Sequence, residues 1–595
     1  MRCRVTARSR RVRQGCYADG EWTVQKKYED LRSARWYEGK DRYGFVTRER
    51  TKQAGFTDED FRGKPVIGIF STWSDLNPCH HHFRNRAEEV KRGIWEAGGF
   101  PVEVPVMSLG EAFMRPTTMI YRDLLSIQVE EMLRCHPIDG VVLMGGCDKT
   151  TPAMIMGAAS MNLPAIFMPA GPMLTGRWRG RTLGSGTDST FFYQEMRAGR
   201  ITEAQYHDME YSAARSPGHC MTMGTASTMT SIAEVLGMTL PGAASIPAVD
   251  SRHAHMASRT GRLAVEMVWN DIKPTDLLTR DAFENAILAL MALGGSTNAL
   301  IHLVAMADRV GIDISLKDFD KASERLPVLA DIKPNGKHLM EDFFYAGGLR
   351  GLLSRIKGEL KLDAPSANGK TLGDNIEGAE VFDDAVIRKL DDPLFPRGGL
   401  VVLYGNLAPD GAVLKRSAAT PALLTHKGKA VVFDSIEDMK ARVDDPDLEV
   451  DANSVLVLRG SGARGVPGMP EWGMMPIPKK LLAQGVTDMV RVSDARMSGT
   501  HFGTVALHVA PESAAGGTLA LVRDGDLIEL DVDKRRLQLL VDDAELAARR
   551  AAWVPPPIRH ERGWGKLYAE RVRQPDEGSG LDFLAGLARR DEPRF

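Results

Sequence analysis

The hydrophobic and polar positions in the first third of the chain alternate between two periods. Short apolar runs at 65–70 (PVIGIF), 100–107 (FPVEVPVM) and 164–171 (PAIFMPAG) predict buried strands. Longer stretches with helical spacing lie between them, including 83–99 and 117–135. Strands that alternate with helices of ten or more residues indicate βαβ units, so this pattern predicts a parallel sheet with helices on both faces.

After about residue 385 the pattern changes to short strand-like runs separated by Gly and Asp turns. Examples are 429–435 (KAVVFDS) and 453–460 (NSVLVLRG), and Asp524-Gly525 has the composition of a hairpin turn. We therefore expect an α/β protein. An N-terminal parallel-sheet α/β domain would span residues 31–385, and a C-terminal β-barrel-like domain, either a barrel or a closed sandwich, would span residues 386–595 with a C-terminal tail.

Composition excludes several classes of protein. Of the 595 residues, 43% are hydrophobic and 26% are charged, which is typical of a globular protein. The formal net charge is −2, so the chain has no overall positive potential that would attract nucleic acid or an anionic membrane. Residues 1–30 differ, because the first fifteen contain six Arg and no acid, and we expect a disordered leader there. No run of eighteen apolar residues predicts a membrane span, and cytoplasmic residence is the default expectation.

Six cysteines are few for this length, and no CxxC pair indicates a disulfide framework or a zinc ribbon. Cys79, Cys147 and Cys220 each fall in a loop at a strand end or a helix start of the α/β domain. If the fold brings them together, three thiolates suit a soft metal or an iron–sulfur cluster with one open iron position. The alternative is three unrelated buried cysteines. Because Cys220 precedes a predicted helix, we expect the helix dipole to favour its thiolate.

The stretch 141–152 (VVLMGGCDKTTP) joins a predicted strand to a predicted helix and places Cys147, Asp148 and Lys149 in one turn. Ligands of open α/β sheets bind beyond the carboxyl ends of strands, so chemistry is expected at this turn. Glu111 and Glu471 are loop acids beside Gly or Pro, and together with Asp148 they are candidate Mg²⁺ ligands. Taken singly, each is also typical of a solvated surface acid.

Ser498 follows a predicted strand in a Ser-Gly turn and is a candidate nucleophile or base, provided that a neighbouring cation lowers its pKa. Its surroundings do not match the G-x-S-x-G elbow of hydrolases. His80, His81 and His82 follow Cys79 directly, and adjacent side chains on a short loop point in different directions. We expect at most one functional contact from these three rings.

Five separated segments together resemble the dihydroxy-acid dehydratase and aldonic-acid dehydratase superfamily, over nearly the whole chain from about Leu31. The segments are TWSDLNPC (72–79), GCDKTTP (146–152), CMTMGTASTM (220–229), GGSTNA (294–299) and SDARMSGT (493–500). Further phrases such as HLMEDFFYAGGL and GNLAPDGAVLK look more like the sugar-acid branch, especially pentonate dehydratases that act on substrates such as L-arabinonate.

The resemblance implies a [2Fe–2S] cluster, a Mg²⁺ ion and a catalytic base, in a site between an α/β domain and a β-barrel domain. The implied residues are Cys79, Cys147 and Cys220 for the cluster, Glu111, Asp148, Glu471 and a carbamylated Lys149 for Mg²⁺, and Ser498 as the base. The implied reaction removes water from an aldonate to give the 2-keto-3-deoxy acid. A homodimer or homotetramer is also implied.

Two other functions stay open at this point. One is a dihydroxy-acid dehydratase of branched-chain amino-acid biosynthesis. The other is a non-catalytic iron–sulfur protein, which would be expected to lack Ser498 or the Mg²⁺ acids. His80 and His81 depart from the Asn and the small residue that many relatives carry between the Cys and the last His, which leaves the preferred sugar acid open.

Overall fold

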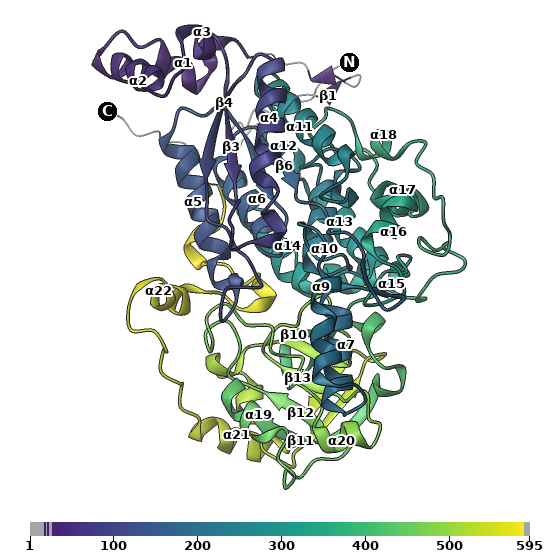
Figure 1. The fold of residues 1–595 in the computed structure, drawn as a ribbon. Coiled ribbons are helices and arrows are strands. Elements are labelled where there is room, and N and C mark those ends of the chain that lie inside the picture. The colour runs from purple at the N-terminus through teal and green to yellow at the C-terminus, as the bar shows by residue number, and fades with distance from the viewer. Residues whose placement is uncertain (1–16, 19–20, 23–25, 588–595) are drawn as a thin grey trace.

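The structure is a computed structural model that describes residues 17–18, 21–22 and 26–587 (Figure 1). The arginine-rich start of the predicted leader lies outside the described residues. Figure 1 shows two bodies stacked end to end, with an α/β domain above and a β-barrel below. The predicted fold class is therefore confirmed.

The α/β domain is built on a four-stranded parallel sheet with strand order β4-β3-β5-β6. The strands are β3 (Val66–Ser71), β4 (Phe100–Pro105), β5 (Gly140–Gly145) and β6 (Ala165–Pro169). Every residue of β3, β5 and β6 is buried, which explains why they are continuous apolar runs in the sequence.

Two pairs of helices form the layers beside this sheet. Helix α4 (Phe83–Glu96) packs on α11 (Ser251–Trp269), and α5 (Arg122–Cys135) packs on α6 (Thr150–Met161). Close packing of the first pair requires glycine, because a Cβ at Gly93 would meet the backbone of Ser258, and one at Gly261 would meet the backbone of Val90. Beyond α6 lie the buried helices α10 (Thr225–Val235), α13 (Arg280–Leu293) and α14 (Asn298–Arg309).

Further helices surround this core. They are α1 (Arg32–Tyr37), α2 (Arg42–Gln53), α8 (Glu203–Asp208), α15 (Leu316–Arg325), α16 (Met340–Tyr345), α17 (Gly348–Arg355) and α18 (Leu372–Ile376). Helix α7 (Ser185–Arg197) belongs to the first domain in sequence but runs down beside the barrel (Figure 1). At its far end the Arg197 guanidinium donates to the Ile477 carbonyl at 3.1 Å and to Asp444 at 2.6 Å.

The second domain is a closed barrel of eight strands in the order β10-β14-β13-β12-β11-β15-β16-β9. The strands are β9 (Val401–Gly405), β10 (Ala408–Leu414), β11 (Thr425–Phe433), β12 (Val455–Leu458), β13 (Arg491–Ser493), β14 (Val505–Ala510), β15 (Leu527–Asp531) and β16 (Arg536–Leu539). Helices α19 (Ile436–Arg442), α20 (Lys479–Ala483), α21 (Asp543–Ala552) and α22 (Gly563–Arg571) lie around it.

Successive side chains of β9 and β10 point to opposite faces of the barrel wall, so these two strands pack against both domains. Val401, Leu403 and Leu414 point into the barrel core, whereas Val402 and Val413 belong to the core of the α/β domain. The predicted hairpin at Asp524-Gly525 is wrong, because the residues before it form a 3₁₀ turn rather than a strand. The hairpin in this region joins β15 to β16 instead.

No helix in the described part of the chain has both the length and the apolar character needed to cross a membrane.

Candidate active site between the two domains

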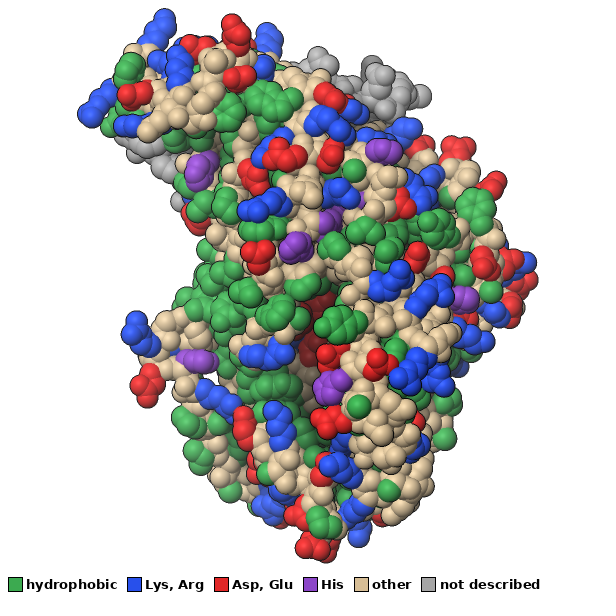
Figure 2. Space-filling view, viewed as in Figure 1, with side chains coloured by type: hydrophobic (Ala, Val, Ile, Leu, Met, Phe, Trp, Pro, Cys, Tyr) green, Lys and Arg blue, Asp and Glu red, His purple; other side chains and the backbone are tan. Residues whose placement is uncertain are grey.

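The candidate residues come from loops of both domains that meet at the carboxyl edge of the parallel sheet. Cys147, Asp148 and Lys149 follow β5 and lead into α6, and Glu111 lies in the loop after β4. The barrel contributes Glu471, together with Ser498 from the loop between β13 and β14. Figure 2 shows a hollow at the waist between the domains, with acidic side chains inside it and hydrophobic side chains around it.

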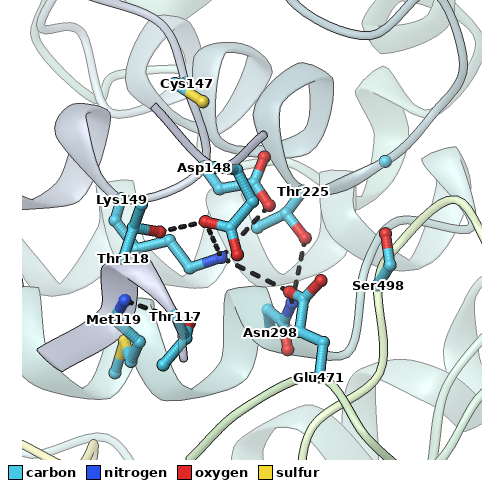
Figure 3. A network of polar contacts seen from close by, with 12 residues as sticks. Thr117, Thr118, Met119, Cys147, Asp148, Lys149, Thr225, Asn298, Glu471 and Ser498 are labelled. Carbon is cyan, nitrogen blue, oxygen red and sulfur yellow. Dashed lines mark hydrogen bonds and ion pairs between the residues drawn. The ribbon is translucent and has the colours of Figure 1, made fainter. Parts of the chain in front are cut away.

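The Lys149 ammonium is the centre of this arrangement (Figure 3). Its Nζ lies 3.1 Å from Glu111 Oε2, 3.2 Å from Asp148 Oδ2 and 3.3 Å from Glu471 Oε1. The Lys149 side chain is fully buried, whereas each of the three carboxylates keeps some exposed surface. Three anions therefore surround one buried cation, and together they present a net negative charge to the hollow.

The pKa values of these groups follow from burial and mutual charge. Burial lowers the pKa of Lys149, but the carboxylates of Glu111 and Glu471 outweigh burial and raise it above its usual value. Burial raises the pKa of Asp148 to about 6, against the opposing charge of Lys149. Burial also acts to raise the pKa of Glu471, but Lys149 and Arg496 outweigh it and hold this pKa at about 2. Glu471 therefore keeps its negative charge to a lower pH than Asp148 does.

Two residues to which the sequence analysis assigned no role hold Glu471 in place. Arg496 donates to Glu471 Oε1 at 2.9 Å and to Thr117 Oγ1 at 2.9 Å, and its guanidinium is fully buried. Asn298 donates to the same Oε1 at 2.8 Å from the first turn of α14. Both belong to segments that carry the resemblance, GGSTNA and SDARMSGT, but nothing in the spacing of those segments indicates that they share a partner.

Ser498 lies on the barrel loop across the network from Lys149 (Figure 3). Its hydroxyl is 3.0 Å from the Thr500 hydroxyl and accepts from the Thr500 N–H at 3.4 Å. Within the described residues, these are its hydrogen bonds, and neither involves a carboxylate or an imidazole.

The three predicted thiols converge in the α/β domain. Cys79 lies in the 3₁₀ helix Pro78–His80, and its pKa is raised well above the usual value by a hydrogen bond with Cys147, then by burial and by the charge of Cys220. The three thiols are free cysteines. The expectation that the helix dipole favours the Cys220 thiolate is wrong. Cys220 lies five residues before α10, and burial followed by the charge of Asp148 raises its pKa to about 12.

These donor sets fit the groups that the resemblance implies. Among the residues that the structure describes, no three His, Cys, Asp or Glu side chains surround a point as a single metal ion requires. At the carboxylates, that point is filled by the Lys149 ammonium. At the thiols, mutual proximity opposes ionisation, which a cationic group would relieve. Two irons would share three thiols, so the three sulfur atoms need not surround one point.

The histidines after Cys79 separate into two buried rings and one exposed ring. His80 is fully buried, and its Nδ1 lies 3.0 Å from Asn77 Nδ2. The Nε2 of His82 lies 2.9 Å from the Ala170 carbonyl oxygen, so this ring ties the loop to the end of β6. His81 is exposed and lines a surface cavity of about 440 Å³ whose lining includes none of the candidate cluster, Mg²⁺ or base residues. The expectation of at most one functional contact among the three stays a prediction.

Sequence models of the N-terminal and C-terminal domains of dihydroxy-acid/6-phosphogluconate dehydratases match residues 64–375 and 385–579. The chain is 51% identical over 572 residues to a 6-deoxy-6-sulfo-D-gluconate dehydratase of Pseudomonas putida, covering 96% of this chain and 99% of that one. It is 51% identical over 568 residues to an L-arabinonate dehydratase of Rhizobium leguminosarum bv. trifolii (95% and 98%). A dihydroxy-acid dehydratase of Ignicoccus hospitalis is 40% identical over 541 residues (89% and 97%).

Proposed function

Because the chain belongs to the dihydroxy-acid/6-phosphogluconate dehydratase family, we propose that it eliminates water from an aldonate to give the 2-keto-3-deoxy acid. The observation that carries this proposal is the convergence of three carboxylates from two domains on Lys149 Nζ, at 3.1 to 3.3 Å. Such a concentration of carboxylates is the environment that a divalent cation requires, and a cation bound there could in turn bind the carboxylate of the substrate.

The residues that would hold Mg²⁺ are Glu111, Asp148, Glu471 and Lys149. As an ammonium, Lys149 cannot ligate a cation. Addition of CO₂ to its neutral amine, with release of one proton, would make it a carbamate with anionic oxygen donors. That change removes the positive charge at the centre of three carboxylates, so a divalent cation would then be needed to balance them. Arg496 and Asn298 would keep Glu471 oriented toward that cation.

The residues that would hold a [2Fe–2S] cluster are Cys79, Cys147 and Cys220. When bound, the two metal centres supply Lewis acidity, which stabilises negative charge on substrate oxygens. The protein groups carry the proton chemistry. Ser498, as an alkoxide, would accept the proton from C2 of the substrate, while the 3-hydroxyl leaves C3 as hydroxide. The electron pair of the broken C–H bond forms the C2–C3 double bond of an enol, which then tautomerises to the 2-keto acid. The Thr500 Oγ1 at 3.0 Å supplies a hydroxyl that can donate to Ser498.

We further propose a pentonate such as L-arabinonate as the substrate. The two relatives named above for sugar acids are each 51% identical to this chain, against 40% for the dihydroxy-acid dehydratase, which favours the sugar-acid branch. Identity does not separate five-carbon from six-carbon acids, because the relatives named for L-arabinonate and for 6-deoxy-6-sulfo-D-gluconate are both 51% identical. The chain departs from many relatives at His80 and His81, so we propose that the segment of these two residues contributes to that selection.

The test is anaerobic turnover with Mg²⁺ on a panel of pentonates, hexonates, 6-deoxy-6-sulfo-D-gluconate and 2,3-dihydroxy-isovalerate, scored as 2-keto acid formed. Highest kcat/KM on a pentonate supports the full proposal. Highest activity on a hexonate or the sulfonated acid retains the reaction but corrects the substrate. Activity confined to 2,3-dihydroxy-isovalerate would replace the proposal with a role in branched-chain biosynthesis, and no 2-keto acid from any acid would overturn dehydration.

A further inference from the structure

The loop that carries Glu471 follows β12 and lies beside the ends of two other parallel strands of the barrel. Strand β12 pairs in parallel with β13, and β13 pairs in parallel with β14, so the carboxyl ends of all three meet at one edge. Asp494 follows β13 and Glu512 follows β14. Both side chains are fully buried, and neither has a role in the proposed chemistry.

Glu512 holds the first half of this loop through the loop backbone. Its two carboxylate oxygens accept the Arg464 N–H, each at 3.0 Å, and Oε2 also accepts the Gly465 N–H at 3.2 Å. The loop passes so close that a Cβ on Gly462 would lie 2.2 Å from Oε2. Among the residues that the structure describes, every partner of the Glu512 carboxylate is an N–H donor, as an ionised carboxylate requires. Loss of this acceptor would leave the loop donors unpaired.

Asp494 and Arg496 fix the two ends of the same loop. Near its start, Asp494 Oδ1 accepts the Ser461 N–H at 3.0 Å. Near its end, Arg496 Nε donates to the Met469 carbonyl at 2.7 Å. The loop is therefore held at three points, and the Glu512 carboxylate is the point in the middle.

Tight turns connect the segment that Glu512 holds to Glu471. The Val466 N–H donates to the Gly462 carbonyl at 3.0 Å, and the Met469 N–H donates to the Val466 carbonyl at 2.9 Å. Glu471 follows Met469 by two residues. Because each turn starts where the one before it ends, a displacement at Gly465 is passed along the backbone to Glu471.

Gln574, in the C-terminal segment, orients the Glu512 carboxylate. Its Nε2 donates to Glu512 Oε1 at 3.1 Å, and its Oε1 accepts the Glu512 backbone N–H at 2.9 Å. The same segment is tied to the α/β domain, because Arg122 donates to the carbonyls of Gly578 and Ser579 at 3.1 and 2.9 Å. The buried carboxylate therefore has a fixed direction, with one oxygen toward Gln574 and both toward the loop.

We propose that Glu512 is a positioning residue that holds the loop of Glu471 where this carboxylate can ligate Mg²⁺. The inference rests on the proposed function, because it requires Glu471 to be a Mg²⁺ ligand. Mg²⁺ demands near-ideal octahedral geometry, so it tolerates little displacement of a ligand. Arg496 and Asn298 orient the Glu471 side chain, whereas Glu512 fixes the backbone that brings it to the site.

The experiment measures how tightly the anaerobically purified, Mg²⁺-free holoenzyme binds Mn²⁺, a paramagnetic substitute for Mg²⁺, in bicarbonate buffer. Electron paramagnetic resonance of free Mn²⁺ gives the dissociation constant without turnover, and the visible spectrum reports the cluster. Glu471→Gln identifies the site, because it removes the charge of a proposed ligand. Glu437→Gln, at an exposed position, is the matched control.

The test variants are Glu512→Gln and the reciprocal swap Glu512→Gln/Gln574→Glu. In the single variant, the new amide can accept from the loop only by turning its own N–H groups toward the N–H groups of Gln574. The swap moves the carboxylate to position 574, where it can accept both from that amide and from the backbone N–H of residue 512. It therefore restores the hydrogen bonds without restoring the Glu512 charge.

For Glu512→Gln we expect the Mn²⁺ dissociation constant to rise by on the order of 10-fold, with the cluster spectrum unchanged, and the swap should recover most of this loss. An unchanged constant in Glu512→Gln, or a loss that the swap does not recover, would overturn the inference and leave the proposed function intact. If Glu512→Gln does not fold, the swap decides. A folded swap with wild-type affinity supports the inference, and any other result overturns it. Wild-type Mn²⁺ binding that is absent, or that Glu471→Gln does not weaken, would overturn the proposed Mg²⁺ site and the inference with it.

Discussion

The Lys149 ammonium lies 3.3 Å from Glu471 Oε1, although the two residues are 322 positions apart and belong to different domains. Arg496 and Asn298 converge on the same oxygen from the barrel and from α14. The charge balance of the site therefore depends on docking of the barrel against the α/β domain. Loss of the Glu471 charge removes the negative charge that this barrel residue places beside Lys149.

We predict that Glu471→Gln raises the Mg²⁺ concentration for half-maximal turnover by at least about 10-fold, because the amide keeps the shape of the side chain but not its charge. Titration of activity with Mg²⁺ measures this. Glu437→Gln, at an exposed position in the first turn of α19, is the matched control and should leave the titration unchanged. A Glu471→Gln enzyme with the wild-type Mg²⁺ requirement would remove Glu471 from the ligand set.

Ser498→Ala should leave the fold and the visible spectrum intact while kcat falls by about 10² to 10⁴, the range expected for loss of a general base. The hydroxyl makes its described contacts with Thr500 alone, so its removal disturbs little else. Single-turnover assays with substrate deuterated at C2 show whether proton removal is the step affected. Retention of most activity would contradict the assignment of Ser498 as the base.

Cys147→Ser should abolish the visible absorbance of the cluster, because Cys147 contacts Cys79 and lies at the carboxyl end of β5. Cys135→Ser is the matched control, since Cys135 is a free, exposed cysteine at the end of α5. Absorption spectra and iron content of the two variants show whether Cys147 is a ligand of the cluster. An unchanged spectrum in Cys147→Ser would exclude it as a ligand.

Thr187→Val should slow turnover by on the order of 10-fold while leaving the reduction potential unchanged. Thr187 holds the Ser498 loop through the Thr500 carbonyl and does not reach the thiols among the described contacts, so its loss misplaces the base rather than the cluster. Measurement of kcat and potential on the same preparation tests this. A shifted potential would contradict this prediction, because it would place the effect of Thr187 at the cluster as well.

Glu234, in α10, gives a pH dependence of stability. Both its oxygens accept backbone N–H groups, from Gly242 at 2.6 Å and Ala244 at 2.9 Å, and burial raises its pKa from 4.5 to about 7. Between about pH 4.5 and 7 the unfolded chain releases this proton and the folded chain keeps it. Stability should therefore fall as pH rises through this window, by on the order of 3 kcal/mol for this group.

Glu234→Gln removes the titrating group and keeps one acceptor, so the thermal midpoint of the variant should fall less between pH 5 and pH 8, by roughly 5 °C. Differential scanning calorimetry at the two pH values measures the difference. Parallel falls in wild type and variant would show that Glu234 does not titrate in this range.

The sequence predicted the parallel sheet because its strands are buried on both faces and read as continuous apolar runs, such as 65–70. It predicted a β-rich second domain because the strand runs after residue 400 are short and alternate. It did not predict the roles of Arg496 and Asn298, since their shared partner depends on how the barrel docks. Asp524-Gly525 has hairpin composition but follows a 3₁₀ turn, because local turn chemistry does not fix which strands pair.

The two halves of the site are synthesised at different times, because the ribosome makes the chain from its N-terminus. The three thiols lie in the first 220 residues, whereas Glu471 and Ser498 come from the barrel. On the proposed assignment, the ribosome has released every sulfur ligand before the barrel strands are made. Iron–sulfur assembly can therefore act on a nascent α/β domain whose waist is still open, and docking of the barrel then closes over a cluster already in place and completes the magnesium site last.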